Sequence, residues 1–183
     1  FTSSIAGGAG CITNNSNLIK KVYFPREILP ISVVTSGMIN FLISCIIIAI
    51  FVIGGGLDLS WHLIFLPLVV LVQYIISLAF AFIVSAVNVY IRDTEYAVAF
   101  ILNLAFYATP VLYSYEIFNG SALIWLFKLN PMAHLINAYR DIFYVHQIPN
   151  ITNLFIWLLI GVILLTISYK IFKKLEKRFA EEM

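Results

Sequence analysis

The chain has 183 residues, of which 62% are hydrophobic and only 11% are charged, and its net charge is +2. Soluble domains contain about 25% charged residues, so this composition excludes an ordinary soluble domain and predicts an all-α integral membrane protein. The Lys and Arg residues occur in clusters, which indicates membrane topology and no nucleic-acid partner. Cys11 and Cys45 lie far apart, without metal-ligand spacing, so neither a disulfide framework nor a metal site is expected.

Residues 1–16 are small and polar and lead into the run Thr13-Asn14-Asn15-Ser16-Asn17. Side chains of this kind bond to nearby backbone groups and end helices. The first residue is Phe, and the first ten residues lack the basic start and long apolar run of a signal peptide. We therefore expect 1–16 to be the end of a preceding membrane span, in a chain that lacks its N-terminal part.

Residues 17–30 interrupt the apolar sequence with four charged residues and two prolines. A Lys or Arg at the centre of a membrane costs about 2.5 to 3.5 kcal/mol, so this segment is expected to lie in water beside the membrane. Pro25 can begin a helix, where its missing N–H costs nothing, and Pro30 suits a bend where the chain reaches the membrane. The charged residues are Lys20, Lys21, Arg26 and Glu27.

Four uncharged stretches predict membrane spans, at residues 31–53, 63–91, 96–114 and 151–169. The 23 residues of the first stretch, at about 1.5 Å per residue, are enough to cross a hydrocarbon core of about 30 Å. The second stretch is longer than a perpendicular crossing requires, so it should tilt, protrude or kink near Pro67. The glycines at 54–56 are not followed by Lys-Ser or Lys-Thr, so they form no phosphate-binding loop and the chain is not expected to bind ATP itself.

The continuous apolar stretches within residues 115–150 are too short to cross a membrane. This region therefore predicts two short re-entrant or interfacial helices on the outer side. Asn130-Pro131 is a helix-start signal. An apolar stripe at helical spacing follows, with His134, Asn137 and Asp141 on the opposite face. The stripe contains Met132, Leu135, Ile136, Tyr139, Ile142 and Phe143.

The distribution of cations predicts the orientation of the chain. If residues 17–30 lie inside the cell, nine cations lie inside, including five in the tail at 170–183, while only Lys128 and Arg140 lie outside. Cytoplasmic loops carry the excess of Lys and Arg in membrane proteins. The tail is therefore predicted to be cytosolic, as is the turn at Arg92-Asp93.

Several motifs, which together extend over most of the chain, resemble the permease subunits of bacterial ABC-2 type polysaccharide exporters, which serve O-antigen, capsule and teichoic-acid export. They are residues 17–30, Tyr90-Ile91-Arg92-Asp93, residues 107–113 (Tyr-Ala-Thr-Pro-Val-Leu-Tyr), and Leu129-Asn130-Pro131-Met132 with Tyr139-Arg140. The resemblance implies six spans in the intact protein, preceded by an amphipathic helix. It also implies two permeases with two separate ATPase subunits that bind ATP and magnesium, in the bacterial cytoplasmic membrane, with the lipid-linked polymer passing between the permeases.

The same resemblance assigns roles to residues. Residues 18–27 would form the coupling helix that docks on the ATPase, through Leu18, Ile19, Lys20, Lys21, Phe24, Pro25, Arg26 and Glu27. Aromatic platforms suit the apolar faces of sugar rings, so the candidates for the polymer path or its gate are Tyr74, Phe106, Tyr107, Tyr113, Tyr139 and Arg140.

Simpler interpretations of these residues stay open. The cations of residues 17–30 can be ordinary charge beside the membrane, and Arg92-Asp93 can be a solvated turn. The aromatic residues can belong to the interfacial belt or pack between helices. The membrane Asn and Gln residues can form hydrogen bonds between helices. Two other functions are open as well. One is an ABC-2 type exporter of drugs or lipids, and the other is a membrane-embedded glycosyl- or acyltransferase, for which Asp58, Glu116, His134, Asp141 and His146 offer no recognisable constellation.

Overall fold

The computed structural model describes residues 1–21, 24–54, 61–107, 109 and 129–179. Helices dominate this part of the chain, and it contains no strand. The all-α class predicted from the sequence is therefore confirmed. In chain order the elements are α1 (Thr2–Gly10), the 3-10 turn η1 (Thr13–Asn15), α2 (Ser16–Lys21), α3 (Ile28–Gly54), the 3-10 turn η2 (Trp61–Phe65), α4 (Leu66–Tyr90), α5 (Thr94–Tyr107), α7 (Pro131–Arg140), the π-helical turn η4 (Asp141–Val145) and α8 (Ile151–Glu176).

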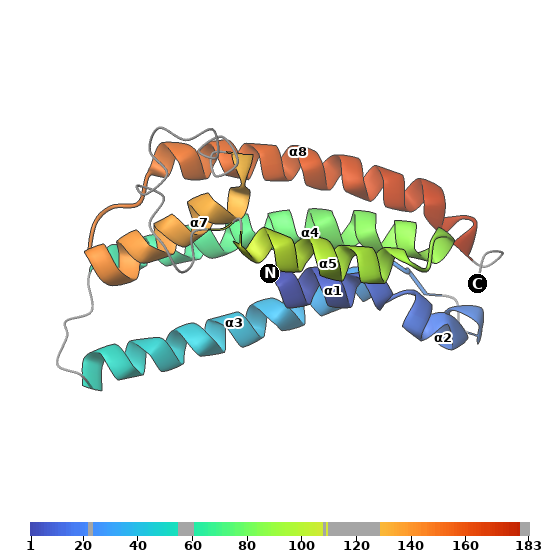
Figure 1. Cartoon of the computed structure of the whole chain (residues 1–183), viewed down its shortest axis with the longest axis horizontal. Coiled ribbons are helices and arrows are strands. Elements are labelled where there is room, and N and C mark those ends of the chain that lie inside the picture. Colours follow the sequence, from blue (N-terminus) through green and yellow to red (C-terminus); the bar gives the residue numbers. More distant parts are fainter. Residues whose placement is uncertain (22–23, 55–60, 108, 110–128, 180–183) are drawn as a thin grey trace.

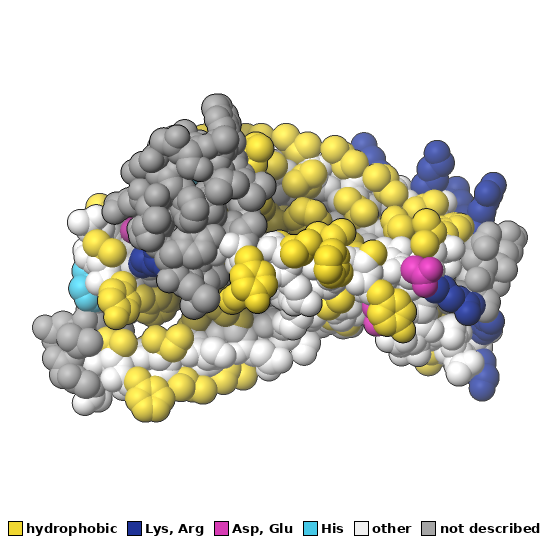
Figure 2. Space-filling view, in the orientation of Figure 1, with side chains coloured by type: hydrophobic (Ala, Val, Ile, Leu, Met, Phe, Trp, Pro, Cys, Tyr) yellow, Lys and Arg dark blue, Asp and Glu magenta, His cyan; other side chains and the backbone are white. Residues whose placement is uncertain are grey.

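The long helices run along one axis, with α4 between α8 and the pair α1 and α3 (Figure 1). Helix α8 packs along much of α4, and α1 packs against α3, α4 and α5. The short helix α2 and the C-terminus lie at one end of the bundle, which we call the basic end because Lys and Arg side chains gather there (Figure 2). Helix α7 lies towards the opposite end, which we call the far end.

Three helices are long and apolar enough to cross a membrane, at Ile28–Gly54, Trp61–Tyr90 and Ile151–Glu176. They contain the predicted spans 31–53 and 151–169 and nearly all of 63–91. Helix α3 begins before Pro30, because a proline is tolerated in the first turn of a helix. Helix α8 continues past residue 169 through three lysines, whose long side chains can reach water while the backbone stays helical.

Two of the predicted spans contain a proline, 63–91 and 96–114, and the structure agrees with them to different extents. Pro67 produces no break within α4, since it occupies the first turn of that helix directly after η2. Of the predicted span 96–114, the structure describes the 14-residue helix α5 and Thr109. A helix of 14 residues extends only about 21 Å, and the rest of the predicted span lies outside the described residues.

Helix α1 approaches its neighbours through glycines. A side chain at Gly8 would bring its Cβ within 3.0 Å of the Ala81 Cβ on α4, and one at Gly7 would come within 3.1 Å of Val33 on α3. A Cβ at Gly37 of α3 would in turn meet the Ser4 hydroxyl of α1. Within a membrane the hydrophobic effect does not drive helices together, because lipid tails are as apolar as the side chains. Small residues instead let the helices approach closely and gain packing contacts. The glycine-rich start of the chain is therefore a helix-packing surface.

A buried amide holds three elements together near the basic end. Asn88 of α4 is 1% exposed. Its side-chain nitrogen donates to the Ala9 carbonyl of α1 at 2.9 Å and to the Thr13 hydroxyl at 3.4 Å, and its oxygen accepts from the Glu95 N–H at the start of α5 at 3.1 Å. Leaving such a group unpaired inside a protein costs about 1 to 3 kcal/mol. Asn88 thus joins helices by hydrogen bonds, which is the role that the simpler interpretation gives to the membrane amides.

Two apolar cores stabilise the two ends of the bundle. The core of the basic end joins α2, α4 and α8 through Ile19, Phe82 and Phe172, and it also contains Phe179. The core of the far end joins α4, α7 and α8 through residues that include Val72, Leu135, Ile142 and Leu154. Both cores are built on α4, and so that helix is the common packing surface of the chain.

Gly8→Leu should destabilise the protein, because the new side chain meets the Ala81 Cα and Cβ, which cannot move aside. Overpacking of this kind costs about 1 to 3 kcal/mol. Gly54→Leu is the matched control, since a Cβ at Gly54 meets nothing within 4 Å. Thermal unfolding of the full-length protein in detergent should show a lower midpoint for Gly8→Leu alone. Equal midpoints for the two variants would contradict the close packing of α1 on α4.

Candidate functional site

We call residues 17–30 the coupling segment, after their predicted role, and the first part of this segment is exposed and basic. Helix α2 carries Leu18, which is 47% exposed, with Lys20 and Lys21, both of which are also exposed. Ile19 points the other way and is buried in the core of the basic end. Helix α2 is therefore held by one apolar side chain while it presents a leucine and two cations to its surroundings.

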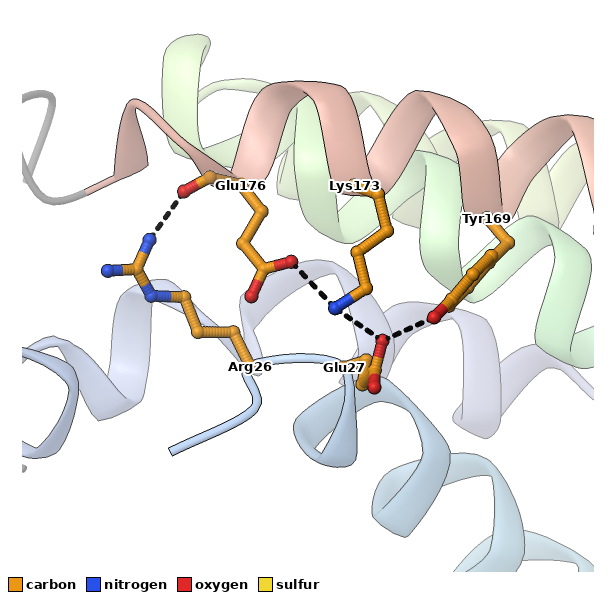
Figure 3. Close-up of polar contacts among 5 residues, drawn as sticks. All are labelled: Arg26, Glu27, Tyr169, Lys173 and Glu176. Atoms are coloured by element: carbon orange, nitrogen blue, oxygen red, sulfur yellow. Dashed lines mark hydrogen bonds and ion pairs between the residues drawn. The ribbon is translucent and has the colours of Figure 1, made fainter. Parts of the chain in front are cut away.

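The expected helix over residues 18–27 is wrong in its extent, because α2 ends at Lys21 and residues 24–27 are not helical. These last residues are instead bound to the C-terminal part of α8. The Glu27 carboxylate lies 2.7 Å from the Lys173 Nζ and accepts a hydrogen bond from the Tyr169 hydroxyl at 2.9 Å. Lys173 also lies 3.1 Å from the Glu176 carboxylate. Tyr169, Lys173 and Glu176 are spaced at i, i+4 and i+7, so they share one face of α8, and Figure 3 shows this face turned towards the coupling segment.

Arg26 completes the contact at the end of α8. Its guanidinium donates to the backbone carbonyl of Glu176 and lies 6.0 Å from the Phe179 ring centre (Figure 3). The Tyr90 hydroxyl donates to the neighbouring carbonyl of Leu175 at 3.0 Å. The last carbonyls of a helix have no partner within it and carry partial negative charge. A cation and a hydroxyl therefore cap α8, and we call Arg26, Glu27, Tyr169, Lys173 and Glu176 the charged cluster.

Aromatic rings lie directly beneath the charged cluster. The Phe172 ring is 5.1 Å from that of Phe82 and 5.6 Å from that of Phe179, both edge to face. The Tyr90 ring lies 6.2 Å from Phe179, and Phe24 packs against the same core. Edge-to-face pairs of this kind add about 0.5 to 1.5 kcal/mol each beyond their buried area. The coupling segment is thus attached through polar contacts above an aromatic core.

The remaining predicted contact at this end is the turn Arg92-Asp93. Both residues are exposed, and the turn connects α4 to α5 immediately after Tyr90, whose hydroxyl reaches the end of α8. Close by, Asn88 links the same end of α4 to the chain before α2. The fold therefore places Arg92 and Asp93 at the same end of the bundle as α2.

Two of the candidate path tyrosines, Tyr74 and Tyr139, make contacts inside the protein. The Tyr74 hydroxyl is hydrogen-bonded to the Thr35 hydroxyl of α3 at 3.0 Å, and the Tyr139 hydroxyl donates to Gln73 of α4 at 2.8 Å. The Tyr139 ring also packs edge to face on Phe41, with 5.4 Å between the ring centres. These tyrosines therefore join α4 to α3 and to α7, respectively.

The other path candidates fall into three groups. Phe106 and Tyr107 lie on α5, where they are 46% and 73% exposed, and their rings contact each other at 5.7 Å. Arg140 is half-buried at the end of α7 and is engaged in an interaction there. Tyr113 lies outside the described residues. The candidates that the structure describes do not come together in one site.

The predicted helix start at Asn130-Pro131 is confirmed. The Asn130 side chain accepts a hydrogen bond from the Met132 N–H at 2.9 Å and donates to the Thr109 hydroxyl at 3.2 Å. The apolar stripe of α7 faces the far-end core, where Leu135 and Ile142 are buried. The opposite face is not purely polar in its contacts, since the His134 ring lies 5.5 Å from the Trp157 ring of α8.

An apolar cavity of about 1090 Å³ lies between α1, α4, α5 and α7. Sequence reasoning did not predict it, because its walls come from segments far apart in the chain. The charged cluster was also missed, although the i, i+4, i+7 spacing of a tyrosine, a lysine and a glutamate near the end of a span is visible in the sequence. The walls of the cavity include Phe1, Ile5, Phe80, Leu104, Phe106 and Ile136.

The ABC-2 type transporter family model matches residues 4–144, which is most of the chain. The chain belongs to the ABC-2 type transporter family. The O-antigen export system permease protein RfbA of Myxococcus xanthus is 37% identical over 184 residues, covering 100% of this chain and 71% of that protein. Two proteins of the same name from Klebsiella pneumoniae are each 34% identical over 183 residues, covering 99% of this chain and 70% of theirs.

Membership in the ABC-2 family confirms the resemblance that the motifs predicted. It also means that the chain is a membrane protein and that its transport cycle involves an ATPase partner. The exposed face of α2 and the turn at 92–93 both lie at the basic end. The family match includes α2, α3, α4, α5 and α7 in full.

The pH dependence of stability should reveal the ion pair in the charged cluster. The hydrogen bond from Lys173, reinforced by that from Tyr169, holds the pKa of the Glu27 carboxyl below its usual value, although partial burial opposes this shift. A carboxyl with a lowered pKa stabilises the fold above its ordinary pKa of about 4.3, and this contribution disappears as the pH falls through the lowered value.

We therefore expect the unfolding temperature of the wild type to exceed that of Glu27→Gln at neutral pH and to approach it below about pH 4.3. Thermal unfolding in detergent across pH 3 to 8 measures this convergence. Asp93→Asn is the control, because Asp93 is an exposed carboxylate at the same end and lies outside the charged cluster. A difference between wild type and Glu27→Gln that is constant with pH would contradict the ion pair.

Proposed function

We propose that this chain is the membrane-spanning permease subunit of an ATP-driven exporter that moves a lipid-linked polysaccharide across the bacterial cytoplasmic membrane. The observation that carries the proposal is that relatives covering 99% to 100% of the chain are permeases of O-antigen export systems. The polymer is an O-antigen, a capsular polysaccharide or a teichoic acid. The chain itself is a transport subunit and not an enzyme.

ATP hydrolysis takes place on a separate nucleotide-binding subunit, which carries the ATP and magnesium. The exposed residues of α2, Leu18, Lys20 and Lys21, are the docking surface for this subunit. A leucine flanked by cations offers both an apolar anchor and charge complementarity to an acidic groove. The basic end accordingly faces the cytosol, as the excess of cations predicts, and the C-terminus lies on that side.

The exposed face of α5 supports a polysaccharide as the substrate. Tyr96, Phe100, Asn103 and Tyr107 recur at i, i+4, i+7 and i+11, and all four are exposed. An amide turned to lipid tails is unfavourable, so Asn103 favours a wet path or a protein neighbour on this face of α5. Aromatic faces and a sparse amide fit the apolar ring faces and hydroxyls of sugars, so this stripe forms part of the polymer path.

A second copy of the permease supplies the opposite wall of the path. No helix of the described chain covers the stripe at Tyr96, Phe100 and Asn103, all of which are exposed. Two copies related by a two-fold axis, the commonest symmetry of oligomers, would enclose the polymer between their stripes. The working exporter then contains two permeases and two ATPase subunits.

A drug or lipid exporter of the same family is the second candidate, and the exposed tyrosines and asparagine of α5 argue against it, because an apolar cargo is best served by an apolar wall. The apolar cavity beside α1 and α5 is the observation in its favour. Measuring export of polysaccharide and efflux of an apolar dye by the same cells separates the two.

Reversing the charge of α2 should weaken docking of the ATPase. Lys20→Glu with Lys21→Glu replaces two attractive contacts with repulsive ones, so co-purification of the ATPase with the full-length permease should fall about tenfold or more. Lys177→Glu is the matched control, an exposed lysine at the same end but on a different element. If the double variant retains the ATPase as well as wild type does, α2 is not the docking surface.

Tyr107→Ala should reduce export while ATPase docking stays intact. An aromatic contact is worth about 0.5 to 1.5 kcal/mol, so the surface polysaccharide of cells that depend on this variant should fall by about two- to tenfold. Tyr144→Ala is the control, since Tyr144 is also highly exposed, at 87%, but lies in η4 and not on the stripe. Equal export by the two variants would remove α5 from the polymer path.

A further inference from the structure

Two segments far apart in the sequence, residues 24–27 and the last turns of α8, are joined at the basic end by side chains. Arg26 and Glu176 are 150 residues apart, and Glu27 and Tyr169 are 142 residues apart. Beneath these polar contacts, Phe24 packs on the core that contains Phe172 and Phe179. The chain connects this segment directly to α3, whereas its connection to α8 depends on side chains alone.

Helix α8 extends from the charged cluster to α7 at the far end (Figure 1). Its first turns contribute Leu154 to the core shared with Leu135 of α7, and Trp157 contacts the His134 ring. Between the two ends, α8 packs closely along α4. A Cβ at Gly161 of α8 would lie 3.2 Å from the side chains of Ile75 and Ile76 of α4, so the glycine permits this close approach. One continuous helix thus touches the coupling segment at one end and α7 at the other.

The Glu27–Lys173 pair is suited to a role beyond its small contribution to stability. The side chains of Glu27 and Lys173 are 24% and 38% exposed, and exposed ion pairs contribute little to folding stability. Hydrogen bonds between charged groups are nevertheless short and directional, and here they fix one face of α8 against Glu27. A contact of this kind can keep two segments in register while the fold does not depend on it.

We propose that the charged cluster is a transmission contact, through which Glu27 and Lys173 make α8 follow the coupling segment when the ATPase moves it, so that movement at α2 reaches α7. This inference rests on the proposed function. It assigns to Lys173 a positioning role in transport that is separate from docking, because Lys173 lies on α8 while the docking residues lie on α2. Arg26 supports the contact by holding the end of α8.

The test uses the full-length permease with its ATPase subunit and compares Glu27→Lys, Lys173→Glu and the double variant in which the two charges are exchanged. Lys174→Glu is the matched control, since Lys174 is the next residue of α8 and is exposed. Three quantities are measured: co-purification of the ATPase, ATP hydrolysis in proteoliposomes, and surface polysaccharide in cells that lack their own permease. Size-exclusion profiles in detergent identify any variant that fails to fold.

We expect both single variants to bind the ATPase and hydrolyse ATP as wild type does, while polysaccharide exported per ATP falls about fivefold or more, the lower end of typical coupling between sites. The exchanged pair, made together with Glu176→Gln because the new carboxylate at position 173 would otherwise lie beside that of Glu176, should recover most of the export, and Lys174→Glu should export normally. If a single variant does not fold, Glu27→Gln or Lys173→Gln takes its place, with the same loss of export expected.

Three results would overturn the proposal: normal export by the single variants, loss of export that the exchanged pair does not restore, or loss of ATPase co-purification in the single variants, which would make the cluster part of the docking surface. Failure of the wild type to bind any ATPase would instead contradict the proposed function itself. The two failures are therefore distinguishable within one experiment.

Discussion

The cost of placing charge in hydrocarbon organises this molecule. Lys20, Lys21 and the lysines of α8 lie towards one end, and three long apolar helices extend away from it. At that end the Glu27 carboxylate meets Lys173 and the Tyr169 hydroxyl. Residues 26 and 27 are therefore attached to α8, and Ile19 holds α2 in the core that also contains Val34 of α3 and Phe172 of α8.

Inside the bundle, polar groups are few and each joins specific helices. Asn88 connects α4 to α1 and α5, Gln73 connects α4 to Tyr139 of α7, and Tyr74 connects α4 to α3. Among the described residues, every buried side-chain nitrogen and oxygen has a hydrogen-bond partner. Because an unpaired polar group is costly away from water, these contacts define which helices are neighbours of α4 more strictly than apolar packing alone could do.

The sequence predicted the candidate site in part. Charge and proline content predicted that residues 17–30 lie beside the membrane, and the structure separates that segment into an exposed face on α2 and residues bound to α8. The separation was not predictable, because Lys20 and Arg26 are both cations in one short segment, and only the position of Glu176 and Phe179 decides that Arg26 turns inwards. Similarly, Tyr74 and Tyr107 are both membrane tyrosines, yet only Tyr107 is exposed.

By itself, the sequence determined the helical class, the long spans and the start of α7, because these depend on local properties: apolar length, charge position, and the capping of a helix by Asn130 before a proline. The motifs also determined the family. Only the tertiary structure decided which surfaces of α1 meet its neighbours through glycine, that Tyr74 and Tyr139 join helices, and that Glu27 binds Lys173. Those contacts join residues far apart in the chain, and they depend on the relative position and rotation of whole helices, which no local pattern specifies.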